Sequence, residues 1–176
     1  FHLKIEDYLE AHPQLKLAFQ PGTYQMKLGK EKLTGLYERA DAFFCNTEEA
    51  RRILKSEEMD LRKLLKMMAG LGPKIVVITD GVKGAYGCDG RDSWFMPLYP
   101  DPKPPLERTG AGDAFSSTLT VALALGKSLP EALEWAPINS MSVVQYVGAR
   151  EGLLSRPQLE DYLKKAPQNY EPQRLS

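Results

Sequence analysis

Three very small residues and an aspartate, Gly110-Ala111-Gly112-Asp113, precede a segment with the composition of a buried helix, Ala114 to Leu125. The first N–H groups of a helix have no intrahelical acceptor, and the helix dipole places partial positive charge there. Glycine lets another group approach such a backbone closely. The segment therefore predicts an anion hole, beside which Asp113 could take a proton from an attacking hydroxyl group. The same spacing is also typical of an aspartate that only caps a helix.

A second polar set follows the apolar run Ile75 to Ile78, which is typical of a strand buried on both faces. In open parallel sheets, ligands bind beyond the carboxyl ends of the strands. Thr79 and Gly81, the first polar groups after this run, could therefore contact a nucleotide phosphate, and Gly84 closes the same segment. The alternative is a plain tight turn that leads into a hairpin.

A third polar set follows the apolar run Ala42 to Cys45. Asn46 and Glu49 have the spacing of a capping box, in which each side chain bonds the backbone of the other residue. The functional alternative is that the two side chains organise a hydrated Mg²⁺ at the end of a strand. Both roles can hold at once.

Composition excludes several classes of protein. The 176 residues carry 23 Lys plus Arg and 23 Asp plus Glu, and a chain without a basic excess argues against a binder of nucleic acid or of a membrane surface. No apolar run approaches the ~20 residues of a membrane span. Gly110-Ala111-Gly112 lacks the Gly-Lys-Ser/Thr of a Walker A loop and the third glycine of a dinucleotide fingerprint. Two cysteines indicate a reduced, cytoplasmic setting.

Alternation of apolar runs with helical patterns predicts βαβ units and a mostly parallel sheet with helices on both faces. Asp89-Gly90 predicts an antiparallel hairpin at one side of that sheet. Pro137 is expected to kink or interrupt the helix that it enters. Expected strands cover residues 15–19, 42–45, 75–78, 85–88 and 93–96, and expected helices cover residues 5–11, 30–39, 48–54, 61–68, 114–125, 129–146 and 159–165.

Residues 1–165 are expected to belong to one domain, followed by a polar tail over residues 166–176 that frays. The sequence opens on a helical pattern without Met, which looks like a start inside a longer gene product.

Along the chain, the Asn46/Glu49 motif comes first, the Thr79–Gly84 motif second, and the Thr109–Asp113 motif last, after a proline-rich crossover. In this order the three motifs closely resemble the C-terminal half of the ribokinase-like, or PfkB, carbohydrate kinases. The resemblance runs from about Phe1 to Leu163. It implies a three-layer α/β/α Rossmann-like fold from which the family's N-terminal part and lid are missing. Because that part supplies most sugar contacts, the present chain alone is expected to be inactive. A homodimer through the missing lid stays open.

The resemblance also implies a role for each motif residue. Asp113 matches the general base, and Gly110, Ala111 and Gly112 match the anion hole for the transferred phosphoryl group. The remaining matches concern ATP: Asn46 and Glu49 help to position Mg²⁺ and the phosphates, Glu49 through water; Thr79, Gly81, Gly84 and Thr109 contact the nucleotide; and Asn139 falls in the segment that lines the adenine pocket.

The implied activity is ATP-dependent phosphorylation of a hydroxyl group on a sugar or sugar acid, with Mg²⁺ as the cofactor. A kinase for nucleosides or other small alcohols and a catalytically silent nucleotide-binding module are the alternatives. Glu107-Arg108-Thr109 stands where many relatives carry Asp-Thr-Thr, so activation by K⁺ is in doubt.

Overall fold

The computed structural model describes residues 2–175, which divide into two compact units. The first unit holds residues up to 80 together with 86–93, and the second holds residues 81–85 together with those from 94 onward. Six strands follow one another in chain order, β1 to β6, across a mixed sheet.

Parallel strands form the centre of the first unit. β1 (Ala18–Phe19) pairs with β2 (Ala42–Asn46), and β2 pairs with β3 (Ile75–Thr79). The register sets Asn46 opposite Thr79. Apart from their ends, β2 and β3 are buried, as continuous apolar runs of this kind predict.

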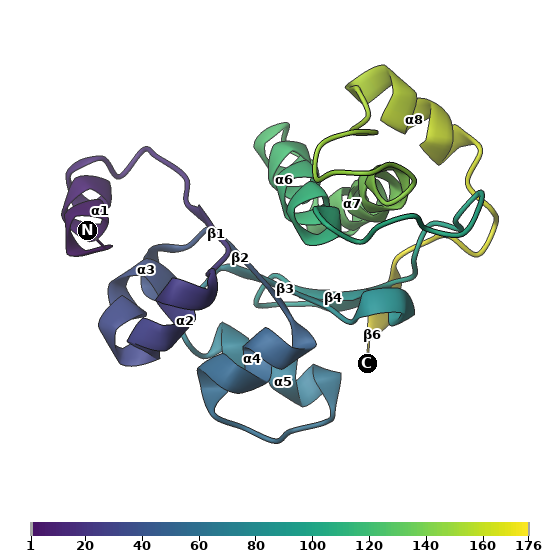
Figure 1. Ribbon diagram of the computed structural model, residues 1–176. Coiled ribbons are helices and arrows are strands. Elements are labelled where there is room, and N and C mark those ends of the chain that lie inside the picture. The colour runs from purple at the N-terminus through teal and green to yellow at the C-terminus, as the bar shows by residue number, and fades with distance from the viewer. Residues whose placement is uncertain (1, 176) are drawn as a thin grey trace. The chain divides into compact units, whose positions relative to one another are not determined.

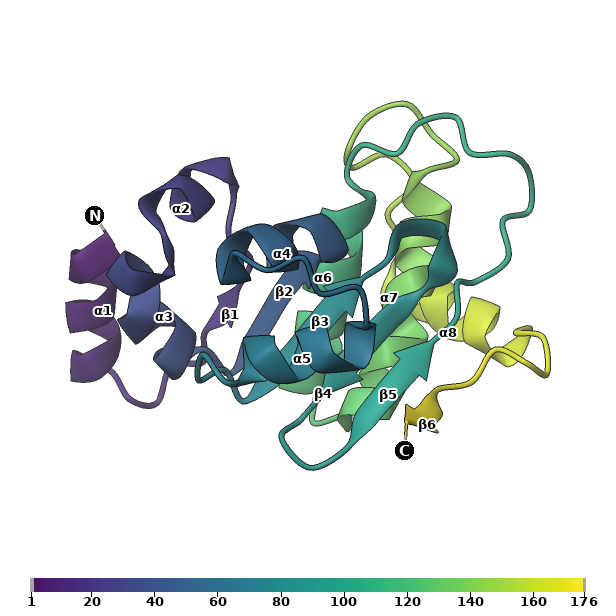
Figure 2. The same ribbon diagram turned by 90° about the horizontal axis from the view of Figure 1, so that it is seen from below.

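Helices α4 and α5 of the first unit are amphipathic and lie over β2 and β3 (Figures 1 and 2). In α5, Leu64, Leu65 and Met68 are fully buried because their spacing puts them on one face of the helix. The helices of this unit are α1 (His2–Ala11), α2 (Thr23–Leu28), the 3₁₀ helix η1 (Lys30–Leu33), α3 (Thr34–Arg39), α4 (Thr47–Leu54) and α5 (Leu61–Ala69).

The strand expected over residues 15–19 is shorter in the structure, where β1 covers only Ala18–Phe19. The helix expected over residues 30–39 is divided into η1 and α3. Side chains form hydrogen bonds with the backbone N–H and carbonyl groups that a longer strand would use for pairing. The Leu17 N–H donates to Asp41 Oδ2 at 3.0 Å, and Arg39 Nη2 donates to the Leu15 carbonyl at 2.5 Å. Helix α2 was not expected from the sequence.

The expected hairpin is confirmed. β4 (Ala85–Cys88) and β5 (Ser93–Met96) are neighbours in the sheet and are joined by four residues, which is too short for a parallel crossover. Asp89 Oδ1 accepts the N–H groups of Arg91 and Asp92 and so fixes the turn.

Helices α6 (Ala111–Ala124), α7 (Leu129–Val143) and α8 (Arg156–Lys164) belong to the second unit, where α6 and α7 pack along each other (Figure 1). Of the kink or interruption expected at Pro137, the interruption is wrong, because α7 continues through it, and the kink stays a prediction. A proline inside a helix costs ~3 kcal/mol. Eleven residues of α7 are buried, Pro137 among them, and this packing offsets the cost. No helix within residues 2–175 has both the length and the apolar character that crossing a membrane would require.

The expected frayed tail is also wrong for the described residues. β6 (Gln173–Leu175) lies beside β5 in the sheet, and Tyr170 is buried. A tail that reads as polar is thus held by one aromatic side chain and a short strand.

Candidate functional site

Gly110 begins α6 in a conformation that only glycine adopts easily. Its φ of +83° and ψ of −7° are left-handed, and its carbonyl accepts the Ala114 N–H at 2.8 Å to open the helix. A Cβ here would lie 2.5 Å from the Ala149 carbonyl oxygen. The helix begins three residues earlier than expected from the sequence, so Gly112 and Asp113 lie inside its first turn.

The first turn of α6 has the features of an anion site. First-turn amides have no intrahelical acceptor, and apart from the two adjacent residues and the backbone of α6 itself, nothing lies within 4 Å of the position that a Cβ on Gly112 would occupy. Asp113 is exposed one residue further on. The Ala111 N–H, by contrast, donates to the Arg108 carbonyl at 3.3 Å. Of the three small residues predicted for the anion hole, Gly112 is therefore the one that leaves open space beside the helix end.

Glu107, two residues before Thr109, connects this turn to a distant segment. Its carboxylate accepts the Thr109 hydroxyl and, through Oε2, the Gly148 N–H at 3.0 Å. These two hydrogen bonds, from Thr109 first and Gly148 second, lower the pKa of Glu107. The sequence carries no signal for this contact, because 41 residues separate its partners.

In the first unit, Asn46 and Glu49 form the predicted capping box at the start of α4. Asn46 Oδ1 accepts the Glu49 N–H at 2.8 Å, and Glu49 Oε2 accepts the Asn46 N–H at 2.9 Å. The register of β2 with β3 brings Thr79 beside Asn46 at the carboxyl ends of both strands. Sequence reasoning missed a further link here, from the Thr47 hydroxyl to Asp80 Oδ1 at 3.3 Å.

The glycines after β3 differ in their surroundings. Gly81 is exposed with φ +54°, and nothing lies within 4 Å of where its Cβ would be. Gly84 is buried with φ +110°, and a Cβ on it would lie 2.4 Å from the Met96 carbonyl oxygen. The close approach of β5 explains Gly84, whereas Gly81 leaves its backbone accessible.

Asn139 is buried in α7, and its side-chain amide is engaged on both sides. Nδ2 donates to the Thr118 hydroxyl at 2.8 Å, and Oδ1 accepts the Leu154 N–H at 2.9 Å. Asn139 thus ties α7 to α6 and to the segment before α8. Its assignment to an adenine pocket stays a prediction.

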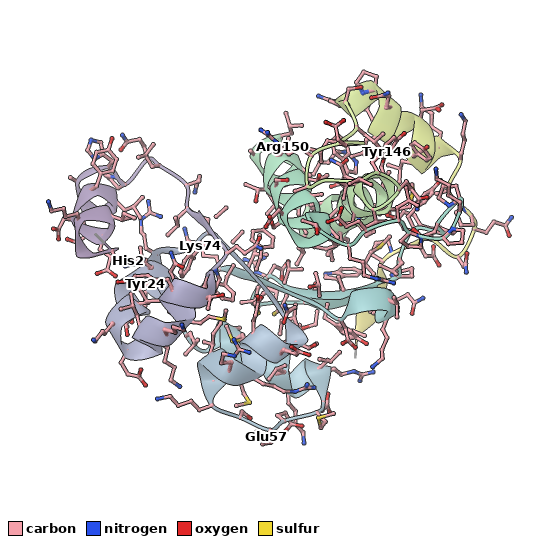
Figure 3. All side chains as sticks on the ribbon, in the orientation of Figure 1. His2, Tyr24, Glu57, Lys74, Tyr146 and Arg150 are labelled. Carbon is pink, nitrogen blue, oxygen red and sulfur yellow. The ribbon has the colours of Figure 1, made fainter. Side chains whose placement is uncertain are left out.

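A cavity of about 820 Å³ lies elsewhere in the first unit, between α1 and the segment from α2 to α3. Glu6, Tyr24 and Lys32 are among its lining residues, and no predicted site residue is. Figure 3 shows His2 and Tyr24 close together on its border, with ring centroids 6.2 Å apart. This cavity therefore lies apart from the chemistry that the motifs indicate.

No three His, Cys, Asp or Glu side chains gather as a metal site in residues 2–175.

Comparison with known sequences gives one family. The model of this family, which is described as "pfkB family carbohydrate kinase", matches residues 8–156. The chain is 32% identical over 117 residues to the cytidine kinase of Thermococcus kodakarensis, an alignment over 65% of this chain and 41% of that protein. It is 36% identical over 94 residues to the ribokinase of Bacillus subtilis, over 53% of this chain and 31% of that protein. The chain thus spans less than half the length of these relatives.

Solved structures agree on the fold. A putative ribokinase II of Escherichia coli in complex with ATP and Mg²⁺ matches with a TM-score of 0.78 at 20% identity, over 93% of this chain and 53% of that one. Arabidopsis thaliana ribokinase complexed with ribose and ATP matches with the same TM-score at 22% identity, over 93% of this chain and 52% of that one. The ribokinase-like α/β fold expected from the sequence is confirmed.

Proposed function

Because the chain belongs to the pfkB family of carbohydrate kinases, we propose that its complete protein transfers the terminal phosphoryl group of ATP to a hydroxyl group of a small molecule. The observation that carries the proposal is the first turn of α6, where an exposed aspartate follows a glycine that leaves open space at the helix N-terminus.

Asp113 acts as the general base in this proposal. Its carboxylate takes the proton of the acceptor hydroxyl while the acceptor oxygen bonds to phosphorus and the bond to ADP breaks. Negative charge on the oxygens of the transferred group is stabilised by the Gly112 amide and the positive end of the α6 dipole. Such transfer needs little from a protein beyond position and charge.

The polar ends of β2 and β3 serve the nucleotide. Glu49 uses one carboxylate oxygen to cap α4, and its other oxygen can accept a hydrogen bond from a metal-bound water. When Mg²⁺ is bound with ATP, it neutralises part of the negative charge of the phosphates. Thr79 offers a hydroxyl group and Gly81 an accessible backbone, both suited to phosphate oxygens.

The acceptor is proposed to be a sugar, with a nucleoside as the second candidate. The similarity to the cytidine kinase, which covers 65% of this chain, favours keeping the nucleoside candidate. Both acceptors present a hydroxyl group of the same chemistry to Asp113.

A panel of sugars, sugar acids and nucleosides, coupled to detection of ADP, tests the proposal in the complete protein. The expected result is ADP release that requires Mg²⁺ and one class of acceptor. Asp113→Asn should lower kcat by ~10²–10⁴, the usual contribution of a general base, while the affinity for ATP stays within a few-fold. ADP release that is independent of any acceptor, or an Asp113→Asn variant with unchanged kcat, would contradict it.

A further inference from the structure

The segment that leads into α6 lies along the segment that leaves α7. The N–H groups of Leu106 and Glu107 both donate to the Val144 carbonyl, at 2.9 and 3.3 Å. Ser140 Oγ donates to the Ala111 carbonyl at 2.7 Å. Ala111 also packs against a small apolar cluster of Ala114, Val143 and Val144. The turn before α6 is therefore built on the end of α7, entirely within the second unit.

Beyond Val144, Gln145 Nε2 donates to the Lys103 carbonyl at 3.2 Å and Ser142 Oγ donates to the Gly152 carbonyl at 2.6 Å, while the middle of the loop is bonded to the turn by the carboxylate of Glu107. The loop of residues 144–152 is mostly exposed from Tyr146 onward, and Tyr146 and Arg150 mark it in Figure 3. Glu107 accepts the Gly148 N–H from this loop and the Thr109 hydroxyl from its own turn. The two bonds use different oxygens of the same carboxylate, so Glu107 joins the turn to the loop.

The loop in turn touches Gly110. A Cβ at Gly110 would lie 2.7 Å from the Ala149 Cα, so the Gly110 and Ala149 backbones are in close contact one residue after the bond at Gly148. A shift of the loop away from Glu107 would remove the surface against which Gly110 rests.

We propose that Glu107 is a positioning residue for phosphoryl transfer: by holding the 144–152 loop against the turn, it keeps Gly110, and with it the Gly112 amide, in the geometry that receives the transferred group. This proposal rests on the proposed function. Each carboxylate oxygen of Glu107 accepts one hydrogen bond from within the protein, from Thr109 and from Gly148, so the proposed role is to hold the backbone and includes no contact with a substrate. Its effect should fall on kcat, since a displacement of about 1 Å at a reacting centre costs on the order of 10² in rate.

Glu131 offers a matched control in the same unit. Its carboxylate also accepts one hydroxyl and one amide, Ser128 Oγ at 2.5 Å and the Ser128 N–H at 2.8 Å, and it too has a lowered pKa, caused by these bonds to Ser128. It caps α7 at the end remote from Val144 and has no place in the proposed chemistry. Loss of either carboxylate removes similar bonds, so a merely structural role predicts similar effects.

The experiment compares Glu107→Ala, Glu107→Gln and Glu131→Ala in the complete protein by kinetics and by amide hydrogen exchange without nucleotide. We expect Glu107→Ala to lower kcat about 10- to 100-fold with little change in KM for ATP, and to speed exchange in residues 106–113 and 144–152. Glu107→Gln keeps one acceptor oxygen and should recover part of both. Glu131→Ala should speed exchange only near the start of α7 and leave kcat unchanged.

Equal losses of kcat in Glu107→Ala and Glu131→Ala would overturn the proposal, as would exchange in 144–152 that Glu107→Ala leaves unaltered. If the wild-type protein phosphorylates no acceptor, the proposed function fails. Hydrogen exchange then decides on its own whether Glu107 holds the loop.

Discussion

At the scale of single residues, two glycines at the start of α6 serve different purposes. Gly110 is required by the backbone, because its φ of +83° is left-handed and the Ala149 backbone leaves no room for a side chain. Gly112 is required by neither condition, since its φ is ordinary for a helix and its surroundings are open. A glycine in a helix costs ~1 kcal/mol relative to alanine, so Gly112 calls for a reason outside folding.

Paired substitutions separate these purposes. Gly112→Ala should leave stability equal or raise it by up to ~1 kcal/mol, yet it should lower kcat strongly because the new methyl group fills the space proposed for the phosphoryl group. Gly110→Ala should destabilise the protein, because the backbone must shift. Thermal unfolding followed by tryptophan fluorescence suits both variants, since Trp94 and Trp135 both lie in the second unit. A Gly112→Ala enzyme with wild-type kcat would exclude the amide from the chemistry.

At the scale of elements, Asp41 holds together the segments around the start of β2. Its carboxylate pairs with Lys74 at 2.9 Å, Lys16 at 3.3 Å and Arg39 at 3.3 Å, and it accepts the Leu17 N–H at 3.0 Å. These partners come from the segment before β1, the end of α3 and the segment before β3. One side chain thus fixes how three segments of the first unit enter the sheet.

This arrangement predicts a dependence of stability on pH. Partial burial raises the pKa of Asp41, but hydrogen bonds from Lys74, the Leu17 amide and Lys16 outweigh it and lower the pKa from 3.8 to about 2. Because the folded-state pKa is the lower one, the contribution is fully present above about pH 4 and is lost as the pH falls toward 2. It amounts to about 1–2 kcal/mol, since the lysine partners are largely exposed and screened.

Asp41→Asn should therefore reduce the free energy of unfolding at pH 6 by this amount and by progressively less below pH 4. Chemical denaturation followed by circular dichroism at pH 6, 4 and 3 measures the difference. A difference that stays constant over this range would show that the charge of Asp41 does not act on stability.

At the scale of the whole chain, the C-terminal residues complete the second unit. The Tyr170 hydroxyl donates to the Glu134 carbonyl at 2.5 Å, and its ring meets Tyr99 edge-on with centroids 4.9 Å apart. Burial, followed by the nearby Glu134 and Tyr99, raises the pKa of Tyr170, so the phenol stays protonated and can donate. Tyr170 therefore links the segment after β5 to α7. The tail continues from there into β6, which lies beside β5 in the sheet.

Tyr170→Ala should destabilise the second unit by about 3–5 kcal/mol, the usual cost of removing a buried aromatic side chain. Tyr170→Phe keeps the ring and loses one hydrogen bond, which is worth about 1 kcal/mol. Chemical denaturation followed by tryptophan fluorescence would resolve the two. Equal stabilities of the wild-type and alanine proteins would mean that the tail contributes nothing to the unit.

The sequence by itself predicted features that depend on neighbours a few residues apart. Apolar runs predicted β2 and β3, Asp89-Gly90 predicted the hairpin, and the spacing of Asn46 with Glu49 predicted a capping box that the structure contains. Each of these signals works within one turn of helix or one strand, where backbone geometry fixes which side chains can meet. The order of the three motifs along the chain likewise predicted the pfkB family, which the family match confirms.

Only the tertiary structure decided what distant segments do to one another. In the structure, Asp41 bonds the Leu17 N–H next to the short strand β1, and α7 continues through the buried Pro137. The buried Tyr170 holds the tail, and Glu107 accepts the Gly148 N–H. The hydrogen bonds of Asp41 with Leu17, of Tyr170 with Glu134 and of Glu107 with Gly148 join residues that are 24 to 41 positions apart. Local spacing cannot encode such pairs, because their free energy appears only when packing has already brought the segments together.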